Sequence, residues 1–317
     1  MPYTTIEGTI GSTPLVELLR TTSENARNRK NIVLGKWECG NPSGSIKDRV
    51  LKTMIRHAEE RGEIRPGDTL IVATGGNTGI SLAMMAAARG YRSVVVMPES
   101  ANYFKQQSIA VYGAKIVLTP KSGGIEYARD LAEQMAAAGE GVLLDQFNNP
   151  DNPLSHYETT GPEIWSATKG KITHFVCPMG TTGTIMGVSR FLKEKNKKVK
   201  IIGVEPANND HITGMYHWQD NQRPRFYEKK RVDQIEEISQ ACAEYRARKM
   251  ASEEGLFCGL SSALFLYLII SLLPDRQYLY KYVSRQFRTF EAFSRNDILC
   301  CRTMKYRFSL CFSLLFL

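Results

Sequence analysis

The chain has 317 residues, of which 43% are hydrophobic, 23% charged and 9% aromatic. This is the composition of an ordinary globular protein of about two domains, and it excludes collagen, coiled coil and wholly disordered chains. Seven cysteines without a CxxC pair or a Cys/His cluster indicate neither a disulfide framework nor a zinc site. We therefore expect a cytoplasmic protein without a metal. No export leader and no apolar run of membrane length is evident, so we expect no membrane partner.

The net charge of +9 is distributed unevenly along the chain. Residues 264–317 contain eight Lys/Arg and only three Asp/Glu, so they supply more than half of that charge. They also contain none of the 25 glycines and three of the seven cysteines. Because residues 1–263 are nearly balanced, we expect no nucleic-acid partner. The break in composition sets the final segment apart from the rest.

Short β-branched runs alternate with helical stretches, which predicts βαβ units and parallel sheets. In the first half of the chain we expect strands at 69–73, 93–97, 115–119 and 141–145, and helices at 80–88, 104–112 and 125–138. The second half repeats the pattern, with strands at 173–177 and 200–204 around a helix at 184–195. The seam between the two similar α/β halves falls near 146–155.

The segment GNPSGSIKDR at 40–49 combines a chain break with the start of a helix. Ser43 or Ser45 can cap that helix, so Lys47 falls in its first turn. The apolar face consists of Ile46, Val50, Leu51, Met54 and Ile55. The positive end of the helix dipole disfavours a protonated amine, which suits a lysine that forms a Schiff base. A solvated surface lysine is the alternative. A phosphate-binding P-loop fits poorly, because GxxxxGK[ST] would need glycine at 45 and lysine at 46.

Two glycine-rich loops each precede a predicted helix. The loop MGTTGT at 179–184 offers backbone N–H groups and threonine hydroxyls without any Lys or Arg, which makes a neutral cradle for a phosphate dianion. It lacks the GxGxxG spacing of NAD sites. In TGGNTG at 74–79 the backbone can hold a carboxylate and Asn77 can hydrogen-bond a ligand oxygen. A tight turn without a ligand is the alternative for each loop. Together with Lys47, the two loops indicate a phosphorylated cofactor and an amino-acid substrate.

Four motifs, in this order, resemble the pyridoxal-phosphate-dependent cysteine synthase/cystathionine β-synthase family: NPSGSIKDR at 41–49, TGGNTG at 74–79, DQFNNP at 145–150 and GTTGT at 180–184. The likeness runs from about Thr5 to Ser262. It implies an α/β, two-domain enzyme of fold type II, like the β subunit of tryptophan synthase, in which each domain is a mainly parallel sheet flanked by helices. The implied boundaries are 40–147 for the smaller domain, 1–39 plus 148–262 for the larger cofactor-binding domain, and 263–317 for a tail outside the family pattern.

Carried over residue by residue, the resemblance implies that Lys47 is the catalytic residue and forms the Schiff base with pyridoxal 5'-phosphate. It implies that Asn77 contacts the ring hydroxyl of the cofactor and that Ser261 faces the pyridine nitrogen. The implied phosphate-binding residues are Gly180, Thr181, Thr182, Gly183 and Thr184. The implied residues for the substrate carboxylate are Thr74, Asn77, Thr78 and Gln146.

The reaction that the resemblance implies is β-replacement. O-acetyl-L-serine and sulfide would give L-cysteine and acetate through an aminoacrylate intermediate, with thiosulfate as an open alternative to sulfide. A homodimer is also implied. The alternatives are a cystathionine β-synthase-like enzyme, a serine/threonine dehydratase, and a catalytically inactive binding protein that keeps the fold.

The chain departs from the family pattern at three places. Gly75 replaces a serine that usually lies near the substrate carboxylate, and residues 214–218 lack the basic pair that precedes the tryptophan in B-type members. After Ser262 we expect neither the last strand nor the helix of the family. We interpret this as an altered reading frame or splice junction near residue 263, with an appended basic arm as the alternative. The alternation of Tyr278, Tyr280 and Tyr282 with Leu279 and Lys281 fits either a strand or a nucleic-acid-facing stripe.

Overall fold

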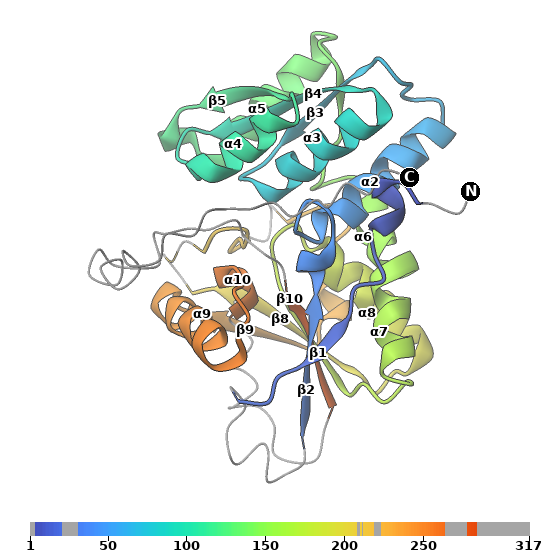
Figure 1. The fold of residues 1–317 in the computed structure, drawn as a ribbon, viewed down its shortest axis with the longest axis vertical. Coiled ribbons are helices and arrows are strands. Elements are labelled where there is room, and N and C mark those ends of the chain that lie inside the picture. The colour runs from blue at the N-terminus through green and yellow to red at the C-terminus, as the bar shows by residue number, and fades with distance from the viewer. Residues whose placement is uncertain are drawn as a thin grey trace, which may run out of the picture. The chain divides into compact units, whose positions relative to one another are not determined.

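The computed structural model describes residues 4–20, 31–207, 210, 212–218, 223–263 and 278–283, the last range in its backbone. The described strands form two sheets (Figure 1). One sheet has six strands in the order β1-β2-β10-β7-β8-β9, and the other has four in the order β5-β4-β3-β6. β1 runs antiparallel to β2, and the other pairings of the described strands are parallel. These sheets confirm the predicted α/β class.

The strands of the larger sheet are β1 (Leu15–Glu17), β2 (Ile32–Trp37), β7 (His174–Pro178), β8 (Lys200–Pro206), β9 (Gln234–Ile238) and β10 (Tyr278–Val283). Those of the smaller sheet are β3 (Thr69–Ala73), β4 (Arg92–Pro98), β5 (Lys115–Thr119) and β6 (Val142–Leu143). The described α-helices are α2 (Lys47–Glu60), α3 (Asn77–Arg89), α4 (Tyr103–Val111), α5 (Gly124–Ala137), α6 (Asp151–Ser155), α7 (Gly161–Ala167), α8 (Gly183–Lys195), α9 (Gln240–Glu254) and α10 (Leu260–Ala263). The single turns are η1 (Ile6–Thr9), η2 (Glu38–Gly40), η3 (Lys121–Gly123) and η5 (Lys229–Arg231), and η4 (His156–Thr160) is a π-helical turn between α6 and α7.

The smaller sheet is buried on both faces, which explains why β3 and β4 read as continuous apolar runs in the sequence. Successive side chains of a strand point to opposite faces. Leu70 and Val95 therefore pack with α2 and α3, whereas Ile71 and Val94 pack against α5. The alanines of α5, such as Ala128, let that helix approach the sheet closely.

In the larger sheet, too, successive side chains of a strand pack on opposite faces. On one face, Phe175 and Ile201 pack with the apolar side of α8. On the other, Val176 and Val204 pack with residues of α9, among them Met250. The carboxyl ends of β3 and β7 both lead into helix starts, at α3 and α8, and this arrangement places two helix N-termini beside one cavity.

The sequence-based boundaries agree with the structure to within a few residues for most elements, and those of β5 agree residue for residue. α3 begins at Asn77 rather than at residue 80, because Gly76 at its N-cap allows the chain to turn into the helix earlier. The strand expected at 141–145 is shorter and covers only Val142–Leu143.

Residues 278–283 correct one expectation about the tail. They form β10, which lies between β2 and β7 and runs parallel to both (Figure 1). Tyr278 pairs with Ile32, and Leu279 pairs with His174. The expectation that the tail lacks a last strand is therefore wrong for these six residues, whose aromatic and β-branched composition favours a strand. The remaining tail residues, 264–277 and 284–317, lie outside the described residues. The interpretation of an altered reading frame concerns these residues, so it falls outside the described part of the chain as well.

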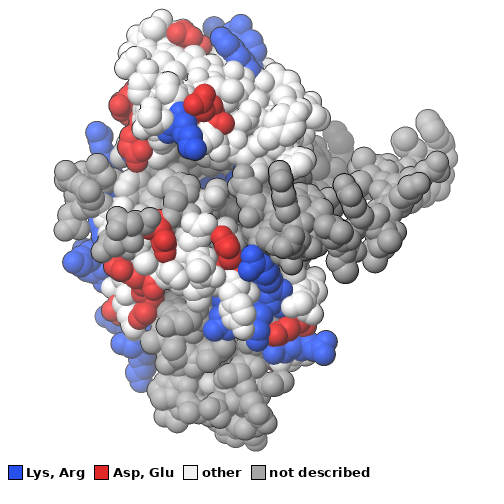
Figure 2. Space-filling view, turned by 90° about the vertical axis from the view of Figure 1, so that its left-hand side faces the viewer, with Lys and Arg blue, Asp and Glu red and all other residues white. Residues whose placement is uncertain are grey.

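Basic and acidic side chains are interspersed over the described part of the surface that Figure 2 shows. Among the described residues of that face, no continuous basic stripe of the kind that tracks a phosphate backbone is seen. Within the described residues no helix has the length and apolarity to cross a bilayer. The same residues contain no group of three or more His, Cys, Asp or Glu side chains placed to hold a metal ion.

Candidate active site

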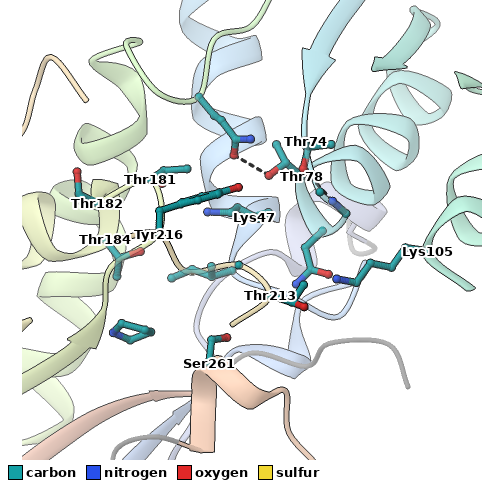
Figure 3. A pocket seen from close by; sticks show the side chains of 18 residues that line it. Lys47, Thr74, Thr78, Lys105, Thr181, Thr182, Thr184, Thr213, Tyr216 and Ser261 are labelled. Atoms are coloured by element: carbon teal, nitrogen blue, oxygen red, sulfur yellow. Dashed lines mark hydrogen bonds between the residues drawn. The ribbon is translucent and has the colours of Figure 1, made fainter. Parts of the chain in front are cut away.

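A cavity of about 110 Å³ lies where α2, α3 and α8 begin (Figure 3). It brings together every residue assigned to the site from the sequence except Gly183. Those on its wall are Lys47, Thr74, Asn77, Thr78, Gln146, Gly180, Thr181, Thr182, Thr184 and Ser261. Gly183 lies behind the wall as the first residue of α8, where a Cβ atom would come 1.9 Å from the Oδ1 atom of Asn152.

Lys47 is the first residue of α2, as expected, but the serines before it act differently from the prediction. The N-cap is Ile46. The Oγ atom of Ser45 accepts a hydrogen bond from the Lys47 N–H at 3.3 Å. Ser43 turns to Asp48 instead, whose carboxylate accepts from both its N–H and its hydroxyl. These bonds hold the turn that presents Lys47 to the cavity (Figure 3).

Lys47 is partly buried at the cavity wall, and the loss of solvent around its amino group lowers its pKa from 10.5 to about 8. The nearby Cys177 opposes this change weakly. Burial in turn raises the pKa of the Cys177 thiol, so the thiol is neutral and acts as a small packing group. A lysine with a pKa near 8 has a usable free-base fraction at physiological pH, which nucleophilic and general-base chemistry require.

A cluster of buried charges supports the first turn of α2 from behind. Arg49 donates to Glu38 through Nε at 2.8 Å and to Glu163 through Nη1 at 2.6 Å. Lys36, on β2, donates to Glu163 at 2.6 Å, and Thr13 donates to Glu38 at 2.5 Å. Glu163, on α7, thus connects Arg49 of α2 with Lys36 of the larger sheet. Arg49 lies two residues after Lys47 in the chain.

The threonine loop at the start of α8 is fixed by close packing and by hydrogen bonds. Thr182 is the N-cap and adopts a left-handed backbone with φ of +62°. A Cβ atom on Gly180 would come 2.4 Å from the Gly214 carbonyl oxygen, so only glycine fits there. Trp218 donates to the Gly180 carbonyl at 2.8 Å, and Asn152 donates to the Thr181 hydroxyl at 3.2 Å.

His156 lies beneath the same loop. Its Nε2 atom is 3.2 Å from the Thr184 hydroxyl, and its Nδ1 atom is 3.0 Å from the Thr160 hydroxyl. Burial, with smaller contributions from Lys47 and Arg49, lowers the pKa of His156 well below its usual range. The imidazole is therefore neutral at pH 7 and holds Thr184 by a hydrogen bond without adding a charge to the cradle.

The loop before α3 forms the opposite wall of the cavity. The Thr74 hydroxyl accepts from the Gly76 N–H at 3.0 Å. Thr78 donates to the side-chain oxygen of Gln146 at 2.7 Å (Figure 3), and Gln146 donates to the Ala73 carbonyl at 2.9 Å. The start of a helix with these polar groups around it is suited to bind a carboxylate.

Three polar side chains on the wall were not assigned to the site from the sequence: Lys105, Thr213 and Tyr216. Lys105 follows β4 at the start of α4. Since parallel strands end at one edge of their sheet, its position after a strand was a usable signal. Tyr216 lies in a loop that packs by tertiary contact, with ring centroids 6.0 Å from Phe147 and 5.1 Å from Trp218, and no local pattern reveals it.

The cavity suits a group that carries both a phosphate and a carbonyl carbon. The buried Thr182 hydroxyl has no hydrogen-bond partner within the described part of the chain, although buried polar groups are normally satisfied. A phosphate oxygen bound at the α8 N-terminus would supply the missing partner. Lys47, with its lowered pKa, supplies the amine for a carbonyl carbon. These features define an α/β enzyme that uses a phosphorylated aldehyde as its cofactor.

The family profile described as "Pyridoxal-phosphate dependent enzyme" matches residues 6–279. The chain therefore belongs to this family of pyridoxal-phosphate-dependent enzymes. The match extends beyond Ser262 and reaches the beginning of β10.

Several known proteins are similar to this chain. It is 52% identical over 258 residues to cysteine synthase B of Escherichia coli strain K12, covering 81% of this chain and 84% of that protein. It is 50% identical over 260 residues to cysteine synthase B of Pseudomonas aeruginosa, covering 82% and 86%. The crystal structure of cysteine synthase from Entamoeba histolytica matches with a TM-score of 0.83 and 31% identity, covering 98% of this chain and 93% of that one. That of O-ureido-L-serine synthase matches with a TM-score of 0.84 and 32% identity, covering 94% and 99%.

Proposed function

We propose that this protein is a cysteine synthase that converts O-acetyl-L-serine and sulfide to L-cysteine and acetate. In this reaction the bond from Cβ to the acetate oxygen breaks, and acetate leaves with the electron pair. Hydrosulfide supplies the pair for the new Cβ–S bond. The observation that carries the proposal is the Lys47 amine, buried between the threonine loop and the loop before α3. The identity of about 50% to cysteine synthase B proteins supports it.

Pyridoxal phosphate, when bound, supplies an electron-withdrawing ring that stabilises the charge developing at the substrate Cα. In our proposal the Nζ atom of Lys47 holds the cofactor, takes the proton from Cα and returns it at the end of the cycle. Residues 180–184 would hold the phosphate, and the Ser261 hydroxyl would face the ring nitrogen. A hydroxyl is too weak an acid to protonate the ring, which suits elimination at Cβ.

We place the substrate carboxylate on the other wall of the cavity, at Thr74, Asn77, Thr78 and Gln146. The hydrogen bond between Thr78 and Gln146 fixes both side chains before substrate arrives. We also propose that Asn77, the first residue of α3, would contact the cofactor ring hydroxyl. The domain division that follows is 40–147 for the carboxylate side and 1–39 with 148–262 for the phosphate side.

The sulfur donor is decided by comparing initial rates with sulfide and with thiosulfate. Tyr216 and His217 stand where a basic pair would favour the divalent thiosulfate anion, so we propose sulfide as the better donor. A higher kcat/KM for thiosulfate would contradict this choice without affecting the proposed Lys47 chemistry.

Related reactions are separated from cysteine synthesis by their products. A cystathionine β-synthase-like enzyme would condense serine with homocysteine, and a dehydratase would release a 2-oxo acid from serine or threonine. A catalytically inactive binding protein would lack the visible absorbance of the bound cofactor. We further propose a cytoplasmic homodimer. Light scattering of the purified protein tests the dimer.

The decisive experiment replaces Lys47 by alanine. We expect Lys47→Ala to lose all measurable cysteine formation and the absorbance band that borohydride removes from the wild type, because the amine is the covalent attachment point and the base. Lys52→Ala on the same helix is the matched control, since Lys52 bonds to the Glu7 carbonyl away from the cavity. Retained turnover in Lys47→Ala, with the control active, would refute the assignment.

A further inference from the structure

Tyr216 brings into the cavity a hydroxyl group that the proposed chemistry leaves without a task. Figure 3 shows its ring reaching into the cavity from the side of the threonine loop. This hydroxyl makes no hydrogen bond to another residue that the structure describes. Among the described residues that line the cavity, none is an Asp or a Glu that could accept from it. The phenol is therefore a hydrogen-bond donor that is available to a bound molecule.

The ring of Tyr216 is held by aromatic neighbours. Its centroid lies 6.0 Å from that of Phe147, at an interplanar angle of 67°, and 5.1 Å from that of Trp218. The Tyr216 N–H donates to the carbonyl of Met179, at the beginning of the threonine loop, at 3.1 Å. Aromatic packing of this kind has a preferred geometry. The direction of the hydroxyl is thus set before a substrate binds.

The Tyr216 hydroxyl keeps its proton at physiological pH. The loss of solvent around the phenol raises its pKa to about 12, and Glu126 and Arg129 make smaller contributions of opposite sign. A neutral phenol donates a hydrogen bond and does not repel an anion. It is therefore suited to an oxygen that gains negative charge during a reaction.

The acetyl group of O-acetyl-L-serine provides such an oxygen. In the proposed function the threonine loop takes the cofactor phosphate and the loop before α3 takes the substrate carboxylate, so the acetyl carbonyl still lacks a donor. When the bond from Cβ to oxygen breaks, acetate takes the electron pair, and the negative charge spreads over both of its oxygens. A hydrogen bond to the carbonyl oxygen therefore strengthens as the bond breaks, which lowers the barrier.

We propose that the Tyr216 hydroxyl donates a hydrogen bond to the acetyl carbonyl oxygen of the substrate and assists the departure of acetate. The proposal rests on the proposed function and adds one catalytic residue to it. No proton is transferred in this step, because acetic acid is a much stronger acid than a phenol. Tyr216 then favours substrates whose leaving group carries an oxygen acceptor.

The kinetic test compares two substrates that differ in their leaving group. O-acetyl-L-serine loses acetate and 3-chloro-L-alanine loses chloride, and the same substrate fragment remains in both cases. We expect Tyr216→Phe to lower kcat/KM for O-acetyl-L-serine by about 10- to 100-fold, because the lost bond is made to a group that gains charge. The values of kcat/KM for 3-chloro-L-alanine and for sulfide should each change less than about twofold.

The matched control is Tyr245→Phe, at a ring on α9 that is 51% exposed and does not line the cavity. It removes the same hydroxyl group and should change none of these three values. Thermal unfolding of both variants verifies that they are folded.

Binding supplies a readout that needs no turnover. In 5-oxo-L-norleucine a methylene group replaces the ester oxygen of O-acetyl-L-serine, so the carbonyl is kept and nothing can leave. L-norleucine lacks that carbonyl. Tyr216→Phe should weaken binding of 5-oxo-L-norleucine to the holoenzyme by about 3- to 10-fold, the worth of a neutral hydrogen bond. Binding of L-norleucine should change less than about twofold, and calorimetric titration measures both.

Three results would overturn the inference. They are an unchanged kcat/KM for O-acetyl-L-serine in Tyr216→Phe, an equal loss for O-acetyl-L-serine and 3-chloro-L-alanine, and a loss confined to sulfide, which would assign the hydroxyl to the nucleophile. Failure of the proposed function has a different signature, since the wild type would then make no cysteine from O-acetyl-L-serine and sulfide.

Discussion

Burial of the Lys47 amino group links the stability of the protein to pH. Its pKa falls from 10.5 in the unfolded chain to about 8 in the fold. Between these values the unfolded chain binds a proton that the folded protein does not, so the stability contribution of this residue rises with pH. At low pH the buried Lys47 ammonium destabilises the fold. This penalty disappears as pH rises from about 8 to 10.5.

The expected result is measured by urea unfolding of the cofactor-stripped protein at pH 7.5 and pH 10. Lys47→Met should be more stable than the wild type at the lower pH, and this advantage should shrink by about 2 kcal/mol at the higher pH. Other titrating groups affect both proteins alike and cancel in the difference. An equal stability advantage of Lys47→Met at the two pH values would show that the charge of the Lys47 amine does not destabilise the fold.

His156 is expected to act through Thr184. Replacing it by leucine removes a neutral hydrogen bond of 3.2 Å beneath the phosphate cradle. Such a bond contributes about 1 kcal/mol, so His156→Leu should weaken binding of pyridoxal phosphate by about fivefold. Absorbance titration of the stripped protein measures this constant.

Thr160→Val is the control for His156→Leu, since it removes the other partner of the imidazole and leaves the Thr184 contact in place. Its cofactor affinity should stay close to that of the wild type. Equal losses in the two variants would mean that the imidazole acts through general packing rather than through Thr184.

At the scale of elements, the charge cluster behind α2 determines how firmly the first turn of that helix is held. Arg49 is nearly fully buried and bonds to both Glu38 and Glu163. Removing one member of a buried ion pair leaves its partner uncompensated, at a cost of about 3–5 kcal/mol. We therefore expect Arg49→Met to lower the free energy of unfolding by about that amount, measured by urea denaturation at pH 7.

Glu163 makes the same cluster sensitive to acid. Its burial acts to raise its pKa, but the hydrogen bonds and charges of Arg49 and Lys36 outweigh burial and lower the pKa to about 2. The stability that Glu163 contributes is thus present above its unfolded value of 4.5 and is lost as pH falls toward 2. The stability difference between the wild type and Glu163→Gln should shrink over this range, and a difference independent of pH would contradict the role assigned to the charge.

Local pattern predicted most elements, because the βαβ units from β3 to β8 carry their signals within short windows. β5 and α8 were located to within one residue by alternating runs and flanking glycines. Lys47 and the two glycine-rich loops were predicted because capping residues and glycines mark the start of a helix in the sequence. Lys105 was missed because it belongs to no motif and reaches the cavity only through its place at the edge of the sheet. The cluster of Glu38, Arg49 and Glu163 joins residues far apart in the chain, and no local window contains it.

At the scale of the whole molecule, β10 completes the larger sheet. It pairs with β2 over six residues and with β7 over three, so both would become edges without it. Unpaired edges expose backbone groups and promote association between chains. A chain shortened to 1–287 should therefore retain cooperative unfolding and cofactor absorbance, whereas one shortened to 1–263 should lose both and aggregate.

Circular dichroism and absorbance of the two shortened proteins test this expectation. Lys281→Pro in the full chain is the finer variant, because proline removes a ladder hydrogen bond from an interior strand and should cost about 1–3 kcal/mol for the carbonyl left unpaired. Native behaviour of both the 1–263 chain and the proline variant would show that the sheet does not depend on β10.

The position of β10 also sets an order of events during translation. The smaller sheet uses one contiguous stretch of chain, from β3 to β6, and can assemble before translation is complete. The larger sheet places its last-made strand between one of the first-made strands and one from mid-chain. The edge of β2 that β10 later covers stays unpaired until some 240 further residues have been made. An unpaired strand edge can associate with other chains during that time.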